Sequence, residues 1–423
     1  MDEPLQFLID LPSTDPSATE QSVPVAPKIP WKAGIVVCVD SPGYGGSEID
    51  LCRILHLLPQ AAVVVHSPKA SPQLTRYFSR LGIRTETLPV GNSWQFASRG
   101  LTAAARCLRR HPGAAFFVWA HHADSYRWLQ LALALAGRRF VVVERLIASG
   151  PSEFRNSRLS IPIKRLVARR ATCVVLNAAS QVTHYRTLFG LSDGSIRVIG
   201  ESRPVTTIAD RTRELRAGST QLRAKLGLPN APVILSVARL SAQKRLANLI
   251  EAIREVQTGT SPPVLVLVGD GPDRPELERL ARECIPGRAI FTGYQADPIS
   301  WLAAADVFAL PSACEGLPGA LIEAMAAGLP CVATDIPGNR DLIRHEITGL
   351  LVPVDSTDGL ASAITRVLSD RDLAERLARS GQDLVFAEFD EGREFQAWDA
   401  LFTELAVASQ RDAPRGRPMS RAD

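Results

Sequence analysis

The chain has few lysines, few aromatic residues and no paired cysteine motif. Only six of its 48 basic residues are lysines, and aromatic residues make up 6% of its 423 residues. The formal net charge of +4 is small for this length, so a nucleic-acid partner is not indicated. The seven cysteines include no C-x-x-C pair and no zinc-ligand spacing, which favours reduced, mostly buried thiols in a cytoplasmic protein.

Long apolar segments are also lacking. No run approaches the ~18 apolar residues that a membrane span needs. The start, Met1-Asp2-Glu3, has no basic region followed by an apolar core, so no secretory signal is predicted. Residues 1–30 are rich in Pro, Ser, Thr and acidic groups without periodicity, and residues 409–423 are polar, so both ends are predicted to be disordered tails.

What the chain does contain is a strand-and-helix alternation that occurs twice, which predicts two doubly wound α/β domains. The predicted strands of the first domain are Ile35–Val39, Ala61–Val65, Phe116–Trp119, Phe140–Val143 and Cys173–Leu176. Those of the second are Val233–Val237, Val264–Val268, Ala289–Phe291, Val307–Leu310 and Cys331–Ala333. The predicted limits are residues 31–207 for the first domain, 208–230 for a polar linker, 231–390 for the second domain and 391–408 for a final helix.

A strand–loop–helix–strand unit at Val307–Asp335 is the most informative stretch. Pro318 suits the first turn of its helix, and Gly328 suits the end. The free N–H groups and positive dipole at the start of such a helix suit a phosphate. Glu315 before the helix and Glu323 inside it can accept hydrogen bonds from sugar or ribose hydroxyls, so the unit indicates a nucleotide-sugar. Two solvated glutamates with this spacing by chance are the alternative.

Two cations follow the first strand of the second domain. Arg239 and Lys244 come directly after Val233–Val237. Because ligands of open α/β sheets bind beyond the carboxyl ends of the strands, these cations could neutralise a diphosphate leaving group. The alternative is a solvated arginine and a lysine whose stem covers apolar surface. That alternative is favoured for an R-x4-K motif alone, but not when the motif shares a domain with the glutamate pair.

Together these residues resemble family 4 glycosyltransferases, the retaining enzymes of GT-B architecture. Arg239 and Lys244 are similar to the pair that holds the donor diphosphate in that family. The residues that resemble its E-x7-E region are Glu315, Gly316, Leu317, Pro318 and Glu323. The resemblance implies an α/β GT-B fold, with two Rossmann-like domains facing a central cleft and a C-terminal helix that crosses back to the first domain.

Shorter segments extend the resemblance. Gly293 and Tyr294 resemble a strand-end loop that lines the nucleotide base in this family. Gly45 and Gly46 look like the glycine loop that approaches the donor phosphates, where two glycines allow close backbone contact. His121 lies where family members often place a polar residue facing the acceptor, although which of the two adjacent histidines faces the cleft stays open. For the loop at Gly293 and Tyr294, a glycine turn without a ligand is the alternative.

Two segments depart from the family's pattern. Glu144-Arg145 stands where many members carry a histidine after the strand, and Gly200-Glu201-Ser202-Arg203 replaces an Asn-Gly-Val-Asp-like segment between the domains. Both departures bear on acceptor geometry more than on donor binding. The only D-x-D, at Asp370-Arg371-Asp372, lies in a helical region away from any strand end, so no metal site is predicted.

The stretch from Arg155 to Arg170 interleaves six basic residues with apolar ones. It could contact an anionic membrane, where a lipid-linked acceptor would be found. A solvated helix face is the alternative, and it is the favoured one.

The sequence therefore predicts a hexosyltransferase of polysaccharide or glycoconjugate biosynthesis, in the cytoplasm or at the inner face of the membrane. No cofactor is expected, and the donor substrate is expected to be a UDP- or GDP-linked sugar. The acceptor is expected to be a glycan or a lipid-linked hydroxyl. The predicted catalytic residues are Glu315, Arg239, Lys244 and His121. A GT-B nucleotide-sugar epimerase or hydrolase, or an inactive partner subunit, is the alternative. The sequence leaves the sugar, the base, the linkage and the oligomeric state open.

Overall fold

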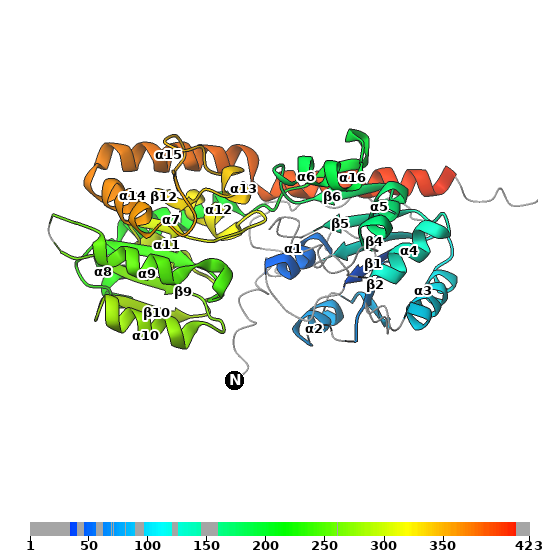
Figure 1. The fold of residues 1–423 in the computed structure, drawn as a ribbon, viewed down its shortest axis with the longest axis horizontal. Helices are drawn as coiled ribbons and strands as arrows, with labels where there is room; N and C mark the ends of the chain where they lie inside the picture. The colour runs from blue at the N-terminus through cyan, green and yellow to red at the C-terminus, as the bar shows by residue number, and fades with distance from the viewer. Residues whose placement is uncertain are drawn as a thin grey trace, which may run out of the picture. The chain divides into compact units, whose positions relative to one another are not determined.

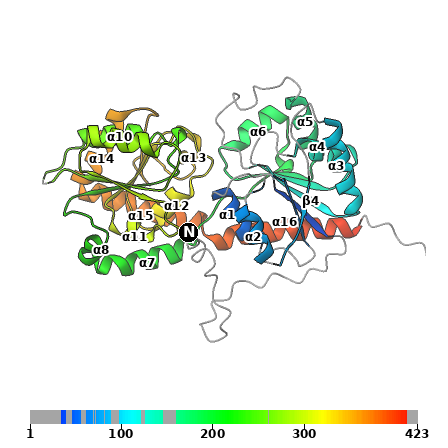
Figure 2. The same cartoon turned by 90° about the horizontal axis from the view of Figure 1, so that it is seen from below.

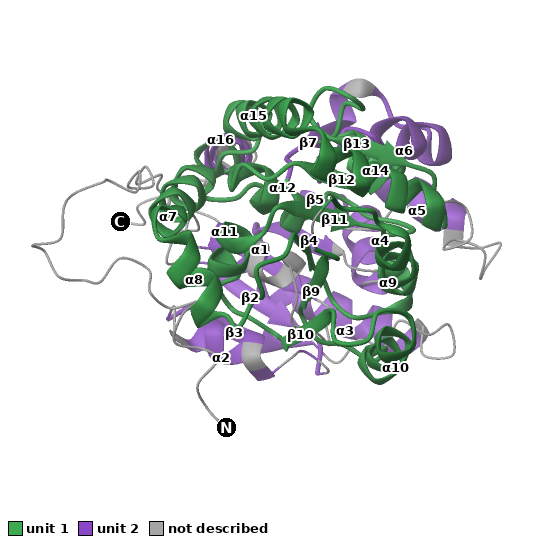
Figure 3. Ribbon diagram, turned by 90° about the vertical axis from the view of Figure 1, so that its left-hand side faces the viewer, with its two compact units in different colours: residues 1–24, 201–394 green, residues 25–200, 395–423 purple. Residues whose placement is uncertain are grey.

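The structure is a computed structural model that describes residues 34–39, 46–55, 62–68, 70, 72–80, 82–88, 97–120, 126–144, 160–259 and 261–411 (Figure 1). The described residues form two compact units (Figure 3). The N-terminal unit, purple in Figure 3, holds those up to Gly200 and from Phe395 onward, and the C-terminal unit, green, holds Glu201–Glu394. Both predicted tails lie outside the described residues, except that the final helix continues to Arg411.

The N-terminal unit is a seven-stranded parallel sheet with the strand order β3-β2-β1-β4-β5-β6-β7. Its strands are β1 (Ile35–Val39), β2 (Val63–His66), β3 (Arg84–Thr87), β4 (Ala115–Ala120), β5 (Phe140–Glu144), β6 (Cys173–Leu176) and β7 (Ile196–Val198). Its helices are α1 (Gly46–Leu55), α2 (Pro72–Arg80), α3 (Ala97–Arg110), α4 (Arg127–Leu135), α5 (Ser160–Arg170), α6 (Gln181–Phe189) and the 3-10 turn η2 (Asp193–Ser195). The central strands are continuous apolar runs because helices cover both of their faces.

The last helix of the chain, α16 (Glu391–Arg411), packs on the N-terminal unit. It lies with α1 and α2 on one face of the sheet, while α3 and α4 cover the other face (Figure 2). Trp398 of α16 is 1% exposed and stacks on Phe402 with ring centroids 5.7 Å apart. The predicted crossover of the C-terminal helix is therefore confirmed.

The C-terminal unit is a six-stranded parallel sheet with the order β10-β9-β8-β11-β12-β13. Its strands are β8 (Val233–Val237), β9 (Val264–Val268), β10 (Ala289–Gly293), β11 (Val307–Leu310), β12 (Cys331–Thr334) and β13 (Leu350–Val352). Its helices are α7 (Val205–Ala217), α8 (Ser219–Lys225), η3 (Ala242–Lys244), α9 (Leu246–Glu255), α10 (Arg274–Cys284), α11 (Ile299–Ala304), α12 (Gly319–Ala326), α13 (Pro337–Arg340), α14 (Thr357–Ser369) and α15 (Arg371–Glu388). Apolar side chains of α9, α10, α14 and α15 form one core with the sheet.

The segment predicted as a linker, residues 208–230, differs from that expectation. It is part of the C-terminal unit and is largely helical, in α7 and α8. The segment is polar overall, but Val205, Ile208 and Ala209 of α7 are buried, and α7 packs on α11 and α12. Arg223 of α8 donates to the carboxylate of Asp306 at 2.8 Å, so a charged residue of this segment also bonds to the rest of the unit.

Three strands were not predicted from the sequence: β3, β7 and β13. Each lies at the edge of its sheet and is only three or four residues long. β3 carries the polar sequence Arg-Thr-Glu-Thr, so it has no apolar run to detect, and its pairing with β2 defines it. None of the seven cysteines, all in the described residues, forms a disulfide, and five are buried, as predicted.

Candidate functional site

The candidate site lies at the carboxyl-terminal edge of the sheet in the C-terminal unit. All six strands run parallel, so the loops after β8, β9, β10, β11 and β12 leave from the same edge. This edge is where ligands of open α/β sheets bind. The predicted donor residues of this unit lie here, in the loops after β8, β10 and β11 and on the helix that follows β11.

The loops after β8 and β11 are joined by hydrogen bonds and one ion pair. Lys244 Nζ lies 2.5 Å from Glu315 Oε1, and the two side chains are only 19% and 7% exposed. Beside this pair, Ala313 N donates to Gln243 O at 2.9 Å and Gln243 Nε2 donates to Cys314 O at 2.8 Å. The structure thus brings together two residues that lie 71 positions apart. Gln243, which fixes the loops, was not singled out from the sequence.

Arg239 differs from Lys244 because its side chain is exposed. It makes no hydrogen bond or ion pair with the part of the chain that the structure describes. It follows β8 directly, with only Ala238 between them. An exposed guanidinium at a strand end can bind phosphate oxygens in a bidentate manner without first breaking an internal ion pair.

Helix α12 begins at Gly319, directly after the loop Glu315–Pro318. Pro318 is its N-cap residue and has an extended backbone. Because the loop before it leaves the carboxyl end of β11, the start of α12 and its free N–H groups lie at the strand-end edge. Leu317 is 5% exposed, so its side chain is packed inside the unit. The loop and helix start therefore offer N–H donors beside Lys244.

Glu323 lies on α12, one turn beyond Gly319, as predicted. Its Oε1 is 3.0 Å from Arg203 Nε, and the two side chains are 23% and 15% exposed. In the sequence, the segment that holds Arg203 stood out only as a departure from the family's pattern. No local signal could have paired the two residues, because they are 120 positions apart.

The loops after β9 and β10 complete this edge. Gly269 has φ +135°, and a Cβ at Gly269 or Gly271 would overlap the carbonyl oxygens of Ala238 and Leu240, respectively. Leu240 N also donates to Asp270 O at 3.0 Å. Glycine is thus required here by the close approach of the two loops.

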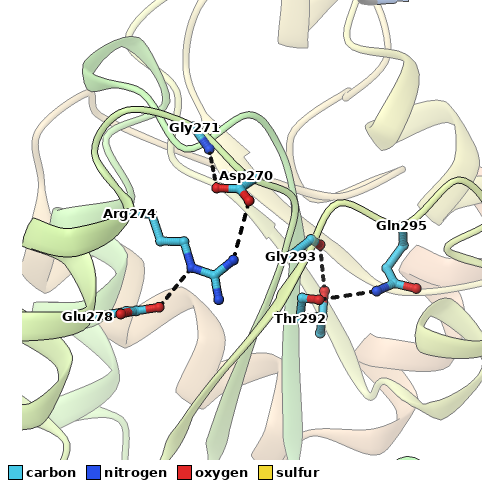
Figure 4. A network of polar contacts seen from close by, with 7 residues as sticks. All are labelled: Asp270, Gly271, Arg274, Glu278, Thr292, Gly293 and Gln295. Carbon is cyan, nitrogen blue, oxygen red and sulfur yellow. Dashed lines mark hydrogen bonds and ion pairs between the residues drawn. The ribbon is translucent and has the colours of Figure 1, made fainter. Parts of the chain in front are cut away.

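Figure 4 shows how polar side chains hold these loops. Arg274 donates through Nε to Glu278 Oε1 at 2.8 Å and lies 3.4 Å from Asp270 Oδ2, while Thr292 Oγ1 donates to Gly293 O at 2.9 Å (Figure 4).

Tyr294 follows Gly293 in the loop after β10 and is 56% exposed. Partial burial raises the pKa of its hydroxyl above the ordinary value. An exposed aromatic ring at this edge suits contact with a base.

In the N-terminal unit, Gly45 and His121 lie outside the described residues, and Gly46 is described only as the first residue of α1. Glu144 is described, and it ends β5 as a buried carboxylate, 4% exposed. Lys164 Nζ of α5 lies 3.2 Å from Glu144 Oε1, and the Tyr185 hydroxyl donates to Oε2 at 3.4 Å. Lys164 is therefore paired inside the unit. It is not available for the membrane contact that the sequence suggested for residues 155–170.

A metal site was not predicted, and the described residues contain no group of three His, Cys, Asp or Glu side chains arranged to hold an ion. Asp370 of the D-x-D has a different role. Its side chain accepts from Leu373 N at 2.9 Å and caps the start of α15. Among the helices described, none is long and apolar enough to cross a membrane.

Residues 219–384 match the family model described as "Glycosyl transferases group 1". The chain is 32% identical over 240 residues to a lipopolysaccharide core biosynthesis glycosyltransferase, LpsE, of Rhizobium meliloti, covering 56% of this chain and 66% of that one. It is also 32% identical over 259 residues to a GDP-mannose-dependent phosphatidylinositol monomannoside mannosyltransferase of Mycobacterium tuberculosis, covering 58% and 64%. The chain thus spans slightly less than two thirds of these relatives.

Solved structures show the same fold. Anabaena HepE in complex with UDP superposes with a TM-score of 0.74 at 21% identity, covering 88% of this chain and all of that one. WaaG, a glycosyltransferase of lipopolysaccharide biosynthesis, gives a TM-score of 0.65 at 17% identity, covering 86% and 99%. Both sheets, their strand orders and the final helix agree with this likeness, so the chain has the GT-B fold that the sequence predicted.

Proposed function

We propose that this chain, whose C-terminal unit matches the glycosyl transferases group 1, is a hexosyltransferase that uses a nucleotide diphosphate sugar. The observation that carries the proposal is the Lys244–Glu315 ion pair, which joins the loop after β8, where exposed Arg239 lies, to the loop that leads into α12 at the same edge of the sheet. Cations and helix N–H groups suit a diphosphate, and a carboxylate beside them suits hydroxyl groups. Neither feature alone would specify a nucleotide-sugar.

Departure of the nucleoside diphosphate is the step these groups would assist. As the bond between C1 of the sugar and the phosphate oxygen breaks, negative charge develops on the diphosphate. Arg239, Lys244 and the N–H groups of α12 would stabilise that charge. In the structure Lys244 is paired with Glu315, so a bound diphosphate would share or take over the Lys244 contact. Glu315 could then accept hydrogen bonds from the sugar hydroxyls.

Transfer with retention of the anomeric configuration is part of the proposal. The acceptor oxygen would form its bond to C1 on the face that the diphosphate leaves. Its proton would pass to the departing phosphate oxygen, so no protein base is required. His121 would contact the acceptor, and Glu323 the ribose. The family resemblance supports this mechanism.

The donor and acceptor classes are proposed from the relatives. HepE was solved with UDP and with UDP-glucose, and the mycobacterial relative is named as GDP-mannose-dependent, so either base is compatible. One relative is named for lipopolysaccharide core biosynthesis and the other for a phosphatidylinositol monomannoside. Both names favour a lipid-linked acceptor in glycoconjugate biosynthesis.

A thermal-shift screen with UDP, GDP, ADP and their sugars is the first test. A ligand at 100 times its dissociation constant stabilises the folded protein by about 2.7 kcal/mol, which is readily measured. Labelled donor is then incubated with lipid-linked acceptors, and the anomeric configuration of the product is determined by NMR. Transfer with retention is expected. Epimerised or free sugar formed without any acceptor would indicate an epimerase or hydrolase, and failure to bind any nucleotide would indicate an inactive partner subunit.

A further inference from the structure

Arg203 lies where two segments of the chain meet beside the start of α12. Its backbone N donates to Phe389 O at 3.1 Å, and its carbonyl oxygen accepts from Glu391 N at 3.2 Å. The neighbouring Ser202 donates through its hydroxyl to Glu394 Oε2 at 2.5 Å, and both residues are buried. The backbone of Arg203 is therefore fixed at both its N–H and its carbonyl group.

The side chain of Arg203 is fixed as well. Its guanidinium donates through Nε to Glu323 Oε1 at 3.0 Å and through Nη1 to Ser202 O at 2.7 Å. Nη2 lies 3.7 Å from Glu201 Oε2. The planar group thus contacts partners in three directions, which a lysine ammonium cannot reproduce with the same geometry.

Gly319, the first residue of α12, leaves the space that this guanidinium occupies. A Cβ built at Gly319 would overlap the guanidinium nitrogen and carbon of Arg203. The glycine is not needed for its backbone conformation, because its φ lies outside the positive range that side chains avoid. Gly319 therefore leaves the space that the side chain of Arg203 needs.

We propose that Arg203 is a positioning residue for the donor, acting through Glu323; this inference rests on the proposed function. Arg203 holds the Glu323 carboxylate in one orientation beside the first turn of α12. A carboxylate that is already oriented loses less conformational freedom when it binds the ribose hydroxyls. Nucleotide affinity should consequently depend on Arg203, although Arg203 itself need not contact the donor.

The first experiment compares Arg203→Lys, Glu323→Ala and the double variant in the full-length protein. Calorimetric titration with UDP and GDP gives Kd, and initial rates with the donor identified by the screen give kcat and KM. Arg203→Lys should raise the nucleotide Kd and the donor KM about tenfold, because the Glu323 carboxylate is then held less firmly in its orientation. It should change kcat by less than about threefold, because Arg203 is not a reacting group. The double variant should bind no worse than Glu323→Ala alone, since the arginine acts through that glutamate.

A second cycle tests the match with Gly319. Gly319→Ala should weaken nucleotide binding when Arg203 is present, because the new Cβ displaces the guanidinium. It should have little effect in an Arg203→Ala background, where the space is empty. Arg223→Lys is the matched control: Arg223 is a partly exposed arginine of the same unit, paired with Asp306 at the amino-terminal end of β11. It should lower the melting temperature without changing the nucleotide Kd.

The outcomes separate this inference from the proposed function. If the parent protein binds nucleotide and transfers sugar, but Arg203→Lys lowers only the melting temperature, Arg203 is a structural residue and the inference is wrong. Additive losses in both double variants lead to the same conclusion. If the parent protein binds no nucleotide at all, the proposed function and the role of Arg203 are both overturned.

Discussion

At the scale of single residues, Glu315 and Glu323 of the C-terminal unit have different partners. Glu315 is paired with Lys244 in the loops, whereas Glu323 is paired with Arg203 on the helix. The proposed roles differ as well, with Glu315 assigned to the transferred sugar and Glu323 to the ribose. The distinction can be tested because free nucleotide contains the ribose but not the sugar.

Glu315→Ala should lower turnover about ten- to a hundredfold, since a lost hydrogen bond to a charged group costs about 1.5–3 kcal/mol. Its affinity for free nucleotide should stay within about threefold of the parent, because Lys244 remains to bind the diphosphate. Glu323→Ala is the comparison and should weaken free nucleotide. Calorimetry and initial rates measure the two effects. Equal loss of nucleotide binding in both variants would contradict the assignment.

Arg245 has an unusual backbone conformation for an arginine. It has φ 50° and ψ 33°, in the left-handed region that costs a non-glycine residue roughly 1–2 kcal/mol. Its ion pair with Asp355, 3.1 Å long, joins side chains that are 43% and 54% exposed. Such an exposed pair contributes about 0–1 kcal/mol, less than the backbone conformation costs.

Arg245→Gly should therefore leave the free energy of unfolding unchanged or raise it by up to about 1 kcal/mol. Arg245→Val should lower it by at least about 1 kcal/mol, because a β-branched side chain is poorly tolerated at positive φ. Urea titrations of both variants would measure the difference. A glycine variant less stable than the parent protein by more than about 1 kcal/mol would show that the ion pair outweighs the backbone strain.

At the scale of elements, α16 contributes a large aromatic face to the N-terminal unit. Trp398 lies 6.0 Å from Trp119 of β4 between ring centroids, and Phe402 packs edge-on against Phe117 at 4.9 Å. These rings belong to the same buried core as β1 and α1. The helix is thus part of the core of that unit.

Trp398→Ala should destabilise the N-terminal unit by about 3–5 kcal/mol, the usual cost of removing a buried tryptophan. Phe386→Ala is the control, because Phe386 is 37% exposed and its removal takes much less buried apolar area from the fold. Urea unfolding followed by circular dichroism would measure both variants. An equal, small effect would show that α16 does not stabilise the unit in solution.

At the scale of the whole molecule, transfer is predicted not to need a divalent metal. The diphosphate charge would be balanced by Arg239, Lys244 and the start of α12. EDTA should therefore leave the initial rate within about twofold of the untreated enzyme, because under this hypothesis protein groups, and not a bound ion, stabilise the leaving group. Activity that is abolished by EDTA and restored by Mg²⁺ or Mn²⁺ would contradict this prediction.

The sequence by itself determined the central strands of both sheets and the charged residues that follow the strands of the second sheet. Five predicted strands, including β1 and β8, have the same limits in the structure, because a short, continuous apolar run rich in β-branched residues suits a strand that is buried on both faces of a parallel sheet. The residues that follow those runs must then lie at one edge. This is why Arg239, Lys244 and Glu315 could be grouped from the sequence alone.

Only the tertiary structure decided the edges of the sheets, the helices of residues 205–225 and the contact of Arg203 with α12. A polar edge strand such as β3 exists because a neighbouring strand supplies its hydrogen bonds, and its own residues do not favour it. The space at Gly319 that Arg203 fills is likewise made by two segments distant in sequence. Local patterns report burial and chain direction, but which distant side chains share a space depends on how the whole unit packs.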